Sequence, residues 1–357
     1  MPRSRFAFLS MLLFVLVVQW DAFAVNLVLP RIGSDLGARA NVLAWVVSAA
    51  MFASVAVKVL AGRVGDRVGL RKLVVVGYVG YAAASALCAL APHAGWLIGA
   101  RIGQGLFGAL VMTGGLALLA SSYPAERRGR AIALAFGLGG IATVAGPVLG
   151  GLVADALGWP YVFWLEVPVA LLGAVFALLA RETVRPGRVR SESVVRNAAL
   201  LRVIAAGSLA NAAVVLVLFA VPWRLATSTA GAWMSVCSAA LALGIAVSDR
   251  LAKVGIVPFL VVAGLALLAT PLSLIGGVAA AAFCLGVVNG LTIATAMTTV
   301  PLDRAGEAAG LTNTALTLAG ALAPALAGSS PHALVIAASL SLAGVVPLVR
   351  SRVRAGS

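Results

Sequence analysis

Long apolar stretches recur along the whole chain and are separated by short polar connections. A helix that spans a bilayer needs about 20 mostly apolar residues. The apolar segments lie approximately at residues 6–29, 42–61, 73–91, 95–120, 131–155, 159–180, 202–221, 231–248, 256–275, 278–299, 308–327 and 331–349. The pattern therefore predicts an all-α integral membrane protein with twelve transmembrane helices.

The composition excludes an ordinary soluble protein. Hydrophobic residues make up 62% of the 357 positions and charged residues only 10%, whereas soluble domains average about 25% charged residues. A net charge of +15 would suggest a nucleic-acid partner for a soluble protein. Here the partner implied by the sequence is the lipid bilayer, and we expect no nucleic-acid binding.

The positive charges fix a predicted orientation. With the N-terminus placed inside the cell, 21 of the 26 Lys and Arg residues fall in inner loops and tails, and only Arg31, Arg39 and Arg224 fall outside. Such a bias over short loops is the positive-inside pattern of membrane proteins. Six tryptophans near the proposed outer ends agree with it: Trp45, Trp96, Trp159, Trp164, Trp223 and Trp233. We expect a multi-pass protein of the cell membrane with both termini in the cytoplasm.

The N-terminus imitates a cleavable signal peptide. Arg3 and Arg5 precede an apolar run, and Ala22-Phe23-Ala24 follows it. However, the apolar run continues to Leu29, and cleavage would leave an odd number of helices. We interpret this segment as the first transmembrane helix.

A weak internal repeat predicts two halves. Three small or rigid residues recur at a constant offset of 177 positions, Gly129, Pro147 and Gly151 matching Gly306, Pro324 and Gly328. Transporters are often built from such duplicated units. The prediction is an N-terminal six-helix bundle over 1–180, a basic cytoplasmic linker over 181–201, and a C-terminal six-helix bundle over 202–357.

The connection after the second predicted helix carries charges and glycines at regular spacings. Glycines permit a tight turn between helix ends, and the charges can pair across neighbouring helices. This connection resembles the helix 2–3 signature of the major facilitator superfamily. The resemblance implies an inner gate formed by Gly62, Asp66, Arg67, Gly69, Arg71 and Lys72, although Leu70 stands where the signature usually has a basic residue.

The fourth predicted helix contains Arg101-Ile102-Gly103-Gln104-Gly105. An arginine inside a membrane helix costs at least about 2.5–3.5 kcal/mol, so it should face a partner or a cavity. The run is similar to the Arg-x-x-Gln-Gly signature of the superfamily's drug:proton antiporters, and the resemblance implies a role for Arg101 in proton transfer. The alternative is a structural arginine that fixes helix packing.

Two carboxylic acids lie at a depth similar to that of Arg101. Asp21 is eight residues from the outer end of its helix and Arg101 is six, which places both about 10 Å below the surface and predicts that they are neighbours. Glu166 precedes Pro168, at a position where the family more often has an amide. It is a second candidate for protonation, or alternatively a buried structural acid.

Two further runs resemble family signatures. Gly146, Pro147, Gly150 and Gly151 are similar to the helix 5 signature of antiporters, which marks exporters more than importers, although Ala142 replaces a glycine. Close helix packing alone is the alternative explanation. Trp20-Asp21 followed by Asn26, Leu29 and Pro30 resembles the first helix of the fourteen-helix drug-exporter branch. Residues 181–201 are polar, so the two extra helices of that branch have no place here.

Polar residues inside the predicted helices are candidates for a substrate pathway. They are Asn26, Gln104, Asn211, Asn289 and Asn313. The three cysteines and two histidines are scattered singly, without the spacing of a metal site. We expect no metal and no cofactor, and without a nucleophile–base pair we expect no enzyme.

These observations predict a proton-coupled secondary transporter that exports small amphipathic compounds by alternating access. Its expected partners are protons and a small-molecule substrate, and we expect a monomer. Two alternatives remain: a proton-linked importer of a small metabolite, and a transport-dead relative that acts as a membrane sensor or scaffold. The latter would usually carry an added soluble domain.

Overall fold

The computed structural model describes residues 4–180, 197–220, 227–269, 274–298, 305–327 and 332–348, and within these ranges every regular element is a helix. The chain divides into two compact units, residues 1–188 with 226–232 and residues 189–225 with 233–357. We call them unit 1 and unit 2. The predicted linker over 181–201 lies largely outside the described residues.

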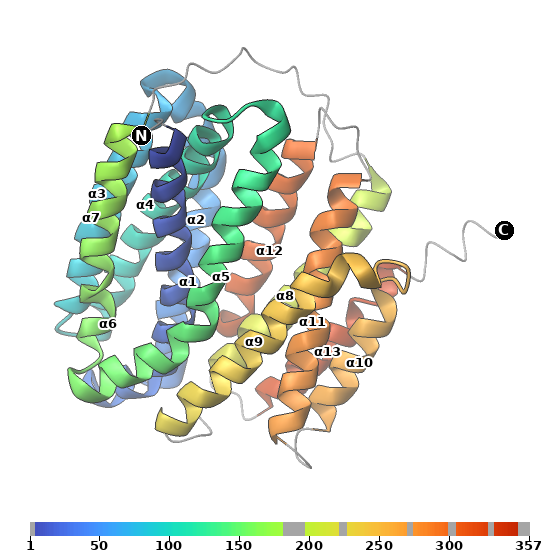
Figure 1. Ribbon diagram of the computed structural model, residues 1–357. Helices are drawn as coiled ribbons and strands as arrows, with labels where there is room; N and C mark the ends of the chain where they lie inside the picture. Colours follow the sequence, from blue (N-terminus) through green and yellow to red (C-terminus); the bar gives the residue numbers. More distant parts are fainter. Residues whose placement is uncertain are drawn as a thin grey trace. The chain divides into compact units, whose positions relative to one another are not determined.

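Helices α1 to α7 belong to unit 1 and match the first six predicted segments (Figure 1). Their bounds are α1 Ser4–Asp35, α2 Ala40–Val68, α3 Leu70–Ala89, α4 Ala94–Ser121, α5 Ala125–Ala156, α6 Pro160–Trp164 and α7 Glu166–Leu179. Helices α6 and α7 together form one apolar span, Pro160–Leu179. The interruption at Leu165 has a local cause, because Pro168 has no N–H to donate to the carbonyl of Trp164.

The remaining helices match the last six predicted segments. Their bounds are α8 Ala198–Ala220, α9 Thr227–Leu251, α10 Val257–Leu268, α11 Leu274–Thr298, α12 Ala305–Ala327 and α13 Ala333–Ala343. In unit 2, α8 packs against α11, α12 and α13, while α10 packs against α11 and α13. Among the described residues, nine helices are long and apolar enough to span a membrane, and three shorter apolar helices complete the predicted set.

The helices of unit 1 pack around α1 and α4. Helix α1 lies between α5 and α7, and α4 packs against both α2 and α3 (Figure 1). The core between α1, α3, α4 and α7 is aromatic: the ring of Phe14 meets those of Tyr78 and Tyr81 edge to face, at centroid distances of 5.8 and 5.9 Å. This packing brings α1, α3, α4 and α7 together at the depth of the polar residues described below.

Apolar side chains also cover much of the outer surface of unit 1. On α7, the side chains of Leu171, Leu172, Val175, Leu178 and Leu179 are each about half exposed. A soluble protein would bury such a row, whereas a lipid-facing helix presents it to the acyl chains.

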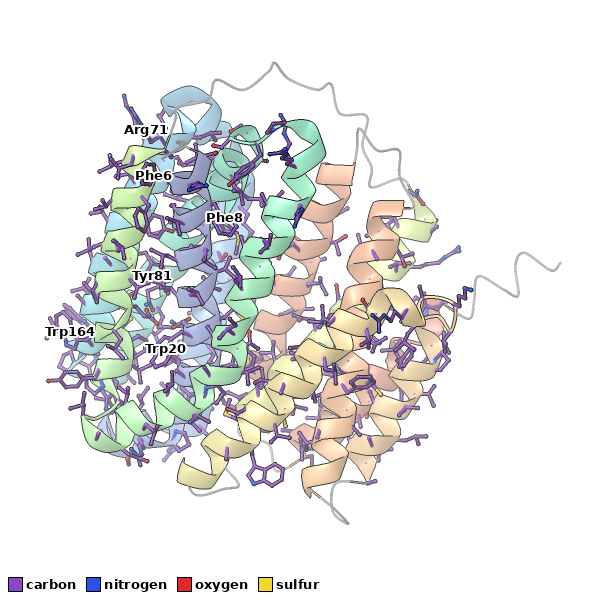
Figure 2. All side chains as sticks on the ribbon, in the orientation of Figure 1. Phe6, Phe8, Trp20, Arg71, Tyr81 and Trp164 are labelled. Atoms are coloured by element: carbon purple, nitrogen blue, oxygen red, sulfur yellow. The ribbon has the colours of Figure 1, made fainter. Side chains whose placement is uncertain are left out.

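The tryptophans predicted to lie at the outer interface differ in their exposure. The side chains of Trp45, Trp96 and Trp164 are exposed, and Figure 2 shows Trp164 at the margin of unit 1. Trp159 is instead only 5% exposed, and its indole N–H donates to the carboxylate of Asp35 at 3.0 Å. Trp223 lies outside the described residues.

The connection between α2 and α3 differs from the sequence prediction. We expected a loop over 62–72, but α2 continues to Val68 and α3 begins at Leu70. Gly69 alone makes the turn, with a φ of 90°, a conformation that costs other residues steric strain. Gly62 and Gly65 are therefore helical residues, and the turn needs one glycine rather than three.

Candidate functional site

A cluster of polar side chains lies buried inside unit 1, between spans that are otherwise apolar. Arg101 and Gln104 come from α4, Glu166 from α7 and Ser85 from α3, and each is at most 4% exposed. Asp21 of α1 joins them with a side chain that is 16% exposed. We call these five residues and their partner Tyr81 the buried polar cluster.

Arg101 is held by acceptors from three helices. Its Nη1 donates to Oδ1 of Asp21 at 2.5 Å and to Oε1 of Gln104 at 2.8 Å, and its Nε donates to the carbonyl of Val46 at 2.9 Å. The guanidinium carbon also lies 5.9 Å from the centroid of the Phe163 ring, within the range of a cation–π contact. The structure thus brings Asp21 and Arg101 together, as their similar depth predicts.

Glu166 is surrounded by neutral donors. Its Oε2 accepts hydrogen bonds from the hydroxyl of Ser85 at 2.8 Å, from Nε2 of Gln104 at 2.8 Å and from the hydroxyl of Tyr81 at 3.3 Å. Its Oε1 is buried and has no hydrogen-bond donor among the described residues. A buried carboxyl group with one unpaired oxygen is a place where a proton or a cation can be held.

Gln104 connects the arginine to the second carboxyl group. Its Oε1 accepts from Arg101 and, at 3.2 Å, from the thiol of Cys88, while its Nε2 donates to Glu166 and to the hydroxyl of Ser85. These contacts fix the amide in one orientation. Gln104 was predicted to line a substrate pathway, and the structure places it inside the cluster at 2% exposure.

Sequence reasoning missed the contribution of α3. Tyr81, Ser85 and Cys88 stand four and three residues apart and therefore share one helix face, and all three contact the cluster. Figure 2 shows Tyr81 among the helices of unit 1. The spacing is visible in the sequence, but hydroxyl and thiol groups are common inside apolar spans, so the spacing alone does not select them.

Asn26 lies apart from the hydrogen bonds of the cluster. Its side-chain nitrogen donates to the carbonyl of Ala22 one turn earlier, at 2.6 Å, and its Oδ1 is buried without a hydrogen-bond partner in the described part of the chain. Earlier on α1, the side-chain nitrogen of Gln19 donates to the hydroxyl of Thr143 on α5 at 2.5 Å. Gln19 and Thr143 thus form a polar contact between α1 and α5.

The glycines of the helix 5 signature lie at the contact between α5 and α1. A Cβ atom at Gly150 would lie 2.6 Å from the Cβ of Ala24, too close for any larger residue. Pro147 is an internal residue of α5, and Gly146 and Gly151 also face α1. Close packing thus accounts for the signature structurally, and its relation to transport direction stays a prediction.

The proposed gating residues are described only in part. Gly62, Asp66 and Arg67 belong to the last turns of α2, and the side chains of Asp66 and Arg67 lie outside the described residues. Gly69 makes the turn, while Arg71 and Lys72 lie in the first turn of α3, Lys72 being exposed.

The candidate residues of unit 2 differ in their surroundings. Asn211 of α8 donates to the carbonyl of Leu316 of α12 at 2.8 Å, so it ties two helices together. Asn289 of α11 has a buried Oδ1 without a partner in the described regions, and Asn313 of α12 is exposed. No group of His, Cys, Asp and Glu side chains that could hold a metal ion occurs among the described residues.

Comparison with known proteins gives a family match and several relatives. The family model described as Major Facilitator Superfamily matches residues 10–324. A tetracenomycin C resistance and export protein of Streptomyces glaucescens is 34% identical over 174 residues, and the multidrug efflux pump LfrA of Mycolicibacterium smegmatis is 34% identical over 170 residues. The riboflavin transporter RibZ of Clostridioides difficile is 31% identical over 156 residues.

These alignments cover only part of each protein. They span 49%, 47% and 44% of this chain, and 32%, 34% and 34% of the three relatives. The relatives' activities therefore bear on this chain only as proposals.

Solved structures match over nearly the whole chain. A bacterial homologue of the human lysosomal transporter Spinster, in an inward-facing and unoccupied conformation, matches with a TM-score of 0.74 and 13% identity, covering 98% of this chain and 95% of that one. A D-xylose–proton symporter matches with a TM-score of 0.73 and 14% identity, covering 96% of each chain. At these identities the likeness establishes the fold.

Proposed function

Because this chain belongs to the Major Facilitator Superfamily, and is thus a multi-pass membrane transporter rather than an enzyme, we propose that it exports small amphipathic compounds in exchange for protons. The compounds would be drugs or natural products. The names of two relatives support export, since one is a resistance and export protein and the other a multidrug efflux pump.

The buried polar cluster is the feature of the structure that supports the proposal of proton coupling most directly. Asp21, Arg101 and Glu166 place two carboxyl groups and one guanidinium inside apolar spans. Burying ionisable groups in a membrane costs free energy, and such groups usually have a function. The pairing of Asp21 with Arg101 at 2.5 Å gives a charge balance that a proton would alter. Asp21, Arg101 and Glu166 are therefore the proposed coupling residues.

Transport would proceed by alternating access of two six-helix bundles, residues 1–180 and 202–357, joined by the basic segment 181–201. Gly62, Asp66, Arg67, Gly69, Arg71 and Lys72 are the proposed inner gate at the α2–α3 junction. Asn26, Asn211, Asn289 and Asn313 are proposed to contact substrate along the pathway. The transporter would act as a monomer in the cell membrane with both termini in the cytoplasm, the orientation that the inner loops' positive charge supports.

Drug susceptibility of an efflux-deficient bacterial host tests the proposal. The host would express the wild-type chain or the Asp21→Asn variant at matched membrane levels, and a panel of lipophilic cations and antibiotics would be applied with and without a protonophore. We expect resistance that disappears in the variant and in the presence of the protonophore. Resistance that Asp21→Asn and the protonophore leave intact would refute proton coupling through this residue.

Import of a small metabolite is the second candidate. One relative is named a riboflavin transporter, and riboflavin is a nutrient that cells take up. This name favours import as the second candidate. Accumulation of radiolabelled riboflavin in cells expressing the chain, driven by an inward proton gradient, would support import. Exclusion of the panel compounds from the same cells would support export.

A further inference from the structure

A groove lies between α3 and α4, outside the hydrogen bonds of the buried polar cluster. It has a volume of about 360 Å³, and its lining consists of glycine, alanine, leucine, phenylalanine and one tryptophan. Gly80 and Ala84 of α3 and Gly99 and Gly103 of α4 are among these residues. Ligand pockets that orient a polar compound carry a few placed polar groups. This lining instead suits a hydrocarbon group.

An aromatic side chain stands at each end of the groove. The indole N–H of Trp96 donates to the carbonyl of Leu87 at 2.9 Å, which fixes the ring across the gap between α4 and α3. The ring of Phe107 lies against Gly80, where a Cβ atom would come within 2.2 Å of it. Between these rings Gly99 leaves open space, because a Cβ atom there would meet nothing within 4 Å. The groove is therefore built into the packing of α3 and α4.

The groove opens onto a surface that suits lipid. Leu87 and Trp96 of its lining are exposed, and so are the apolar side chains of Val76 and Val79 on α3 and of Ile102 on α4. A membrane-spanning helix presents such side chains to the acyl chains of the bilayer. The groove is thus continuous with the contact surface between this transporter and the membrane.

The dimensions of the groove fit one acyl chain. Trp96 and Phe107 are eleven residues apart on α4, which corresponds to about 16 Å along the helix. Half of the hydrocarbon core of a bilayer is about 15 Å thick, and tryptophan is typical of the interface. Over this length the volume gives a mean cross-section of about 22 Å². An α-helix, about 10–12 Å across, is too wide for it.

We propose that the groove between α3 and α4 binds one acyl chain of a membrane phospholipid, in the leaflet at the Trp96 end of α4. The head group lies at the interface beside Trp96, and the chain extends to Phe107 near the middle of α4. With the orientation predicted from the charges, this is the outer leaflet.

The proposed lipid site and the buried polar cluster share two helices. Ala84 and Ala100 line the groove, and the next residues, Ser85 and Arg101, belong to the cluster. A ligand that binds only the folded protein stabilises it. Added phospholipid should therefore raise the melting temperature of the delipidated chain, and this gain should require an open groove.

Photolabelling tests the site. The purified full chain in detergent would be incubated with a phosphatidylcholine that carries a diazirine in the middle of one acyl chain, irradiated, and digested for mass spectrometry. We expect labelling of residues 80–87 and 96–107 that saturates at a single lipid per chain and that excess unlabelled phosphatidylcholine removes. Labelling spread evenly over the exposed apolar residues, those of α7 included, would show lipid contact without a site and would overturn the proposal.

Filling the groove provides the matched variants. Gly99→Leu fills it from α4 without displacing a neighbour, and Ala83→Leu fills it from the exposed face of α3. Each should lose the labelling and the gain in melting temperature. Gly137→Leu is the control, because Gly137 is an exposed glycine of α5 where a Cβ atom also meets nothing within 4 Å. Full labelling of both filled variants, with cooperative melting retained, would contradict the groove as the binding site.

Two other occupants give different outcomes in the same preparation. Labelling that tetraphenylphosphonium, a lipophilic cation, removes and phosphatidylcholine does not would assign the groove to a transported compound. A dimeric wild type that Gly99→Leu converts to a monomer would assign it to a second copy of the chain. Either result would overturn the lipid site. Both leave the proposed export to be decided by the resistance assay.

Discussion

Arg101 is the residue on which the buried polar cluster depends. It is 4% exposed inside an apolar span and contacts Asp21, Gln104 and the carbonyl of Val46. Isolated in the membrane it would cost at least about 2.5–3.5 kcal/mol, and these acceptors offset that cost. The same pairing makes the cluster sensitive to the loss of one charge, because the partner left behind is buried and uncompensated.

A double-mutant cycle measures this dependence. Arg101→Ala should destabilise unit 1 by about 3–5 kcal/mol, because it strands Asp21 without its cation. Asp21→Asn combined with Arg101→Ala should destabilise less, since neither charge then remains. Thermal unfolding of the purified chain in detergent at neutral pH compares the variants. If the double variant were less stable than Arg101→Ala, the ion pair would not be the cause.

The sequence could predict only part of the cluster. The proximity of Asp21 and Arg101 followed from their similar depth in two helices, and their contact confirms it. The contacts of Ser85 and Tyr81 with Glu166 could not be predicted, because they depend on the rotation of α3 toward α7. Rotation about a helix axis is set by packing on all sides, and nearly uniform hydrophobicity around a membrane helix leaves no polar face to reveal it.

At the scale of elements, the helices were predicted well and their junctions less well. All twelve apolar segments contain a described helix, because the need to satisfy backbone groups in lipid leaves few other structures. The junction of α2 and α3 was predicted as a loop but is a single residue, Gly69. Charged residues such as Arg63 and Asp66 end an apolar segment without ending the helix, so the helix extends beyond the hydrophobic pattern.

The contact between α5 and α1 yields a prediction about a single methyl group. Gly150→Ala places a Cβ 2.6 Å from that of Ala24 and should destabilise the protein by about 1–3 kcal/mol, because the two helices must separate. Gly137→Ala is the control on the same helix, since a Cβ there meets nothing within 4 Å. Melting temperatures in detergent should fall only for Gly150→Ala. Equal melting temperatures for both variants would show that α1 and α5 do not require close approach at Gly150.

At the scale of the whole molecule, the family match and the solved structures establish the fold, while the orientation in the membrane remains a prediction from charge. The 21 to 3 distribution of basic residues between inner and outer connections predicts which end of each helix faces the cytoplasm.

Labelling of single cysteines tests the orientation. In a chain whose three native cysteines are replaced by alanine, His93→Cys and Ser122→Cys would place a thiol at opposite ends of α4. A membrane-impermeant maleimide should label intact cells at position 93 and should label position 122 only after permeabilisation. Labelling of position 122 in intact cells would reverse the topology.

The most direct test of the central claim is proton movement driven by substrate. The full chain would be reconstituted in liposomes with an acidic lumen and a lumenal pH dye, and tetraphenylphosphonium or ethidium would be added outside. Coupling through the buried polar cluster predicts that substrate alkalinises the lumen with the wild type and has no effect with Asp21→Asn reconstituted at equal density. Equal alkalinisation in both, or none with a wild type that transports the cation, would contradict proton exchange at this cluster.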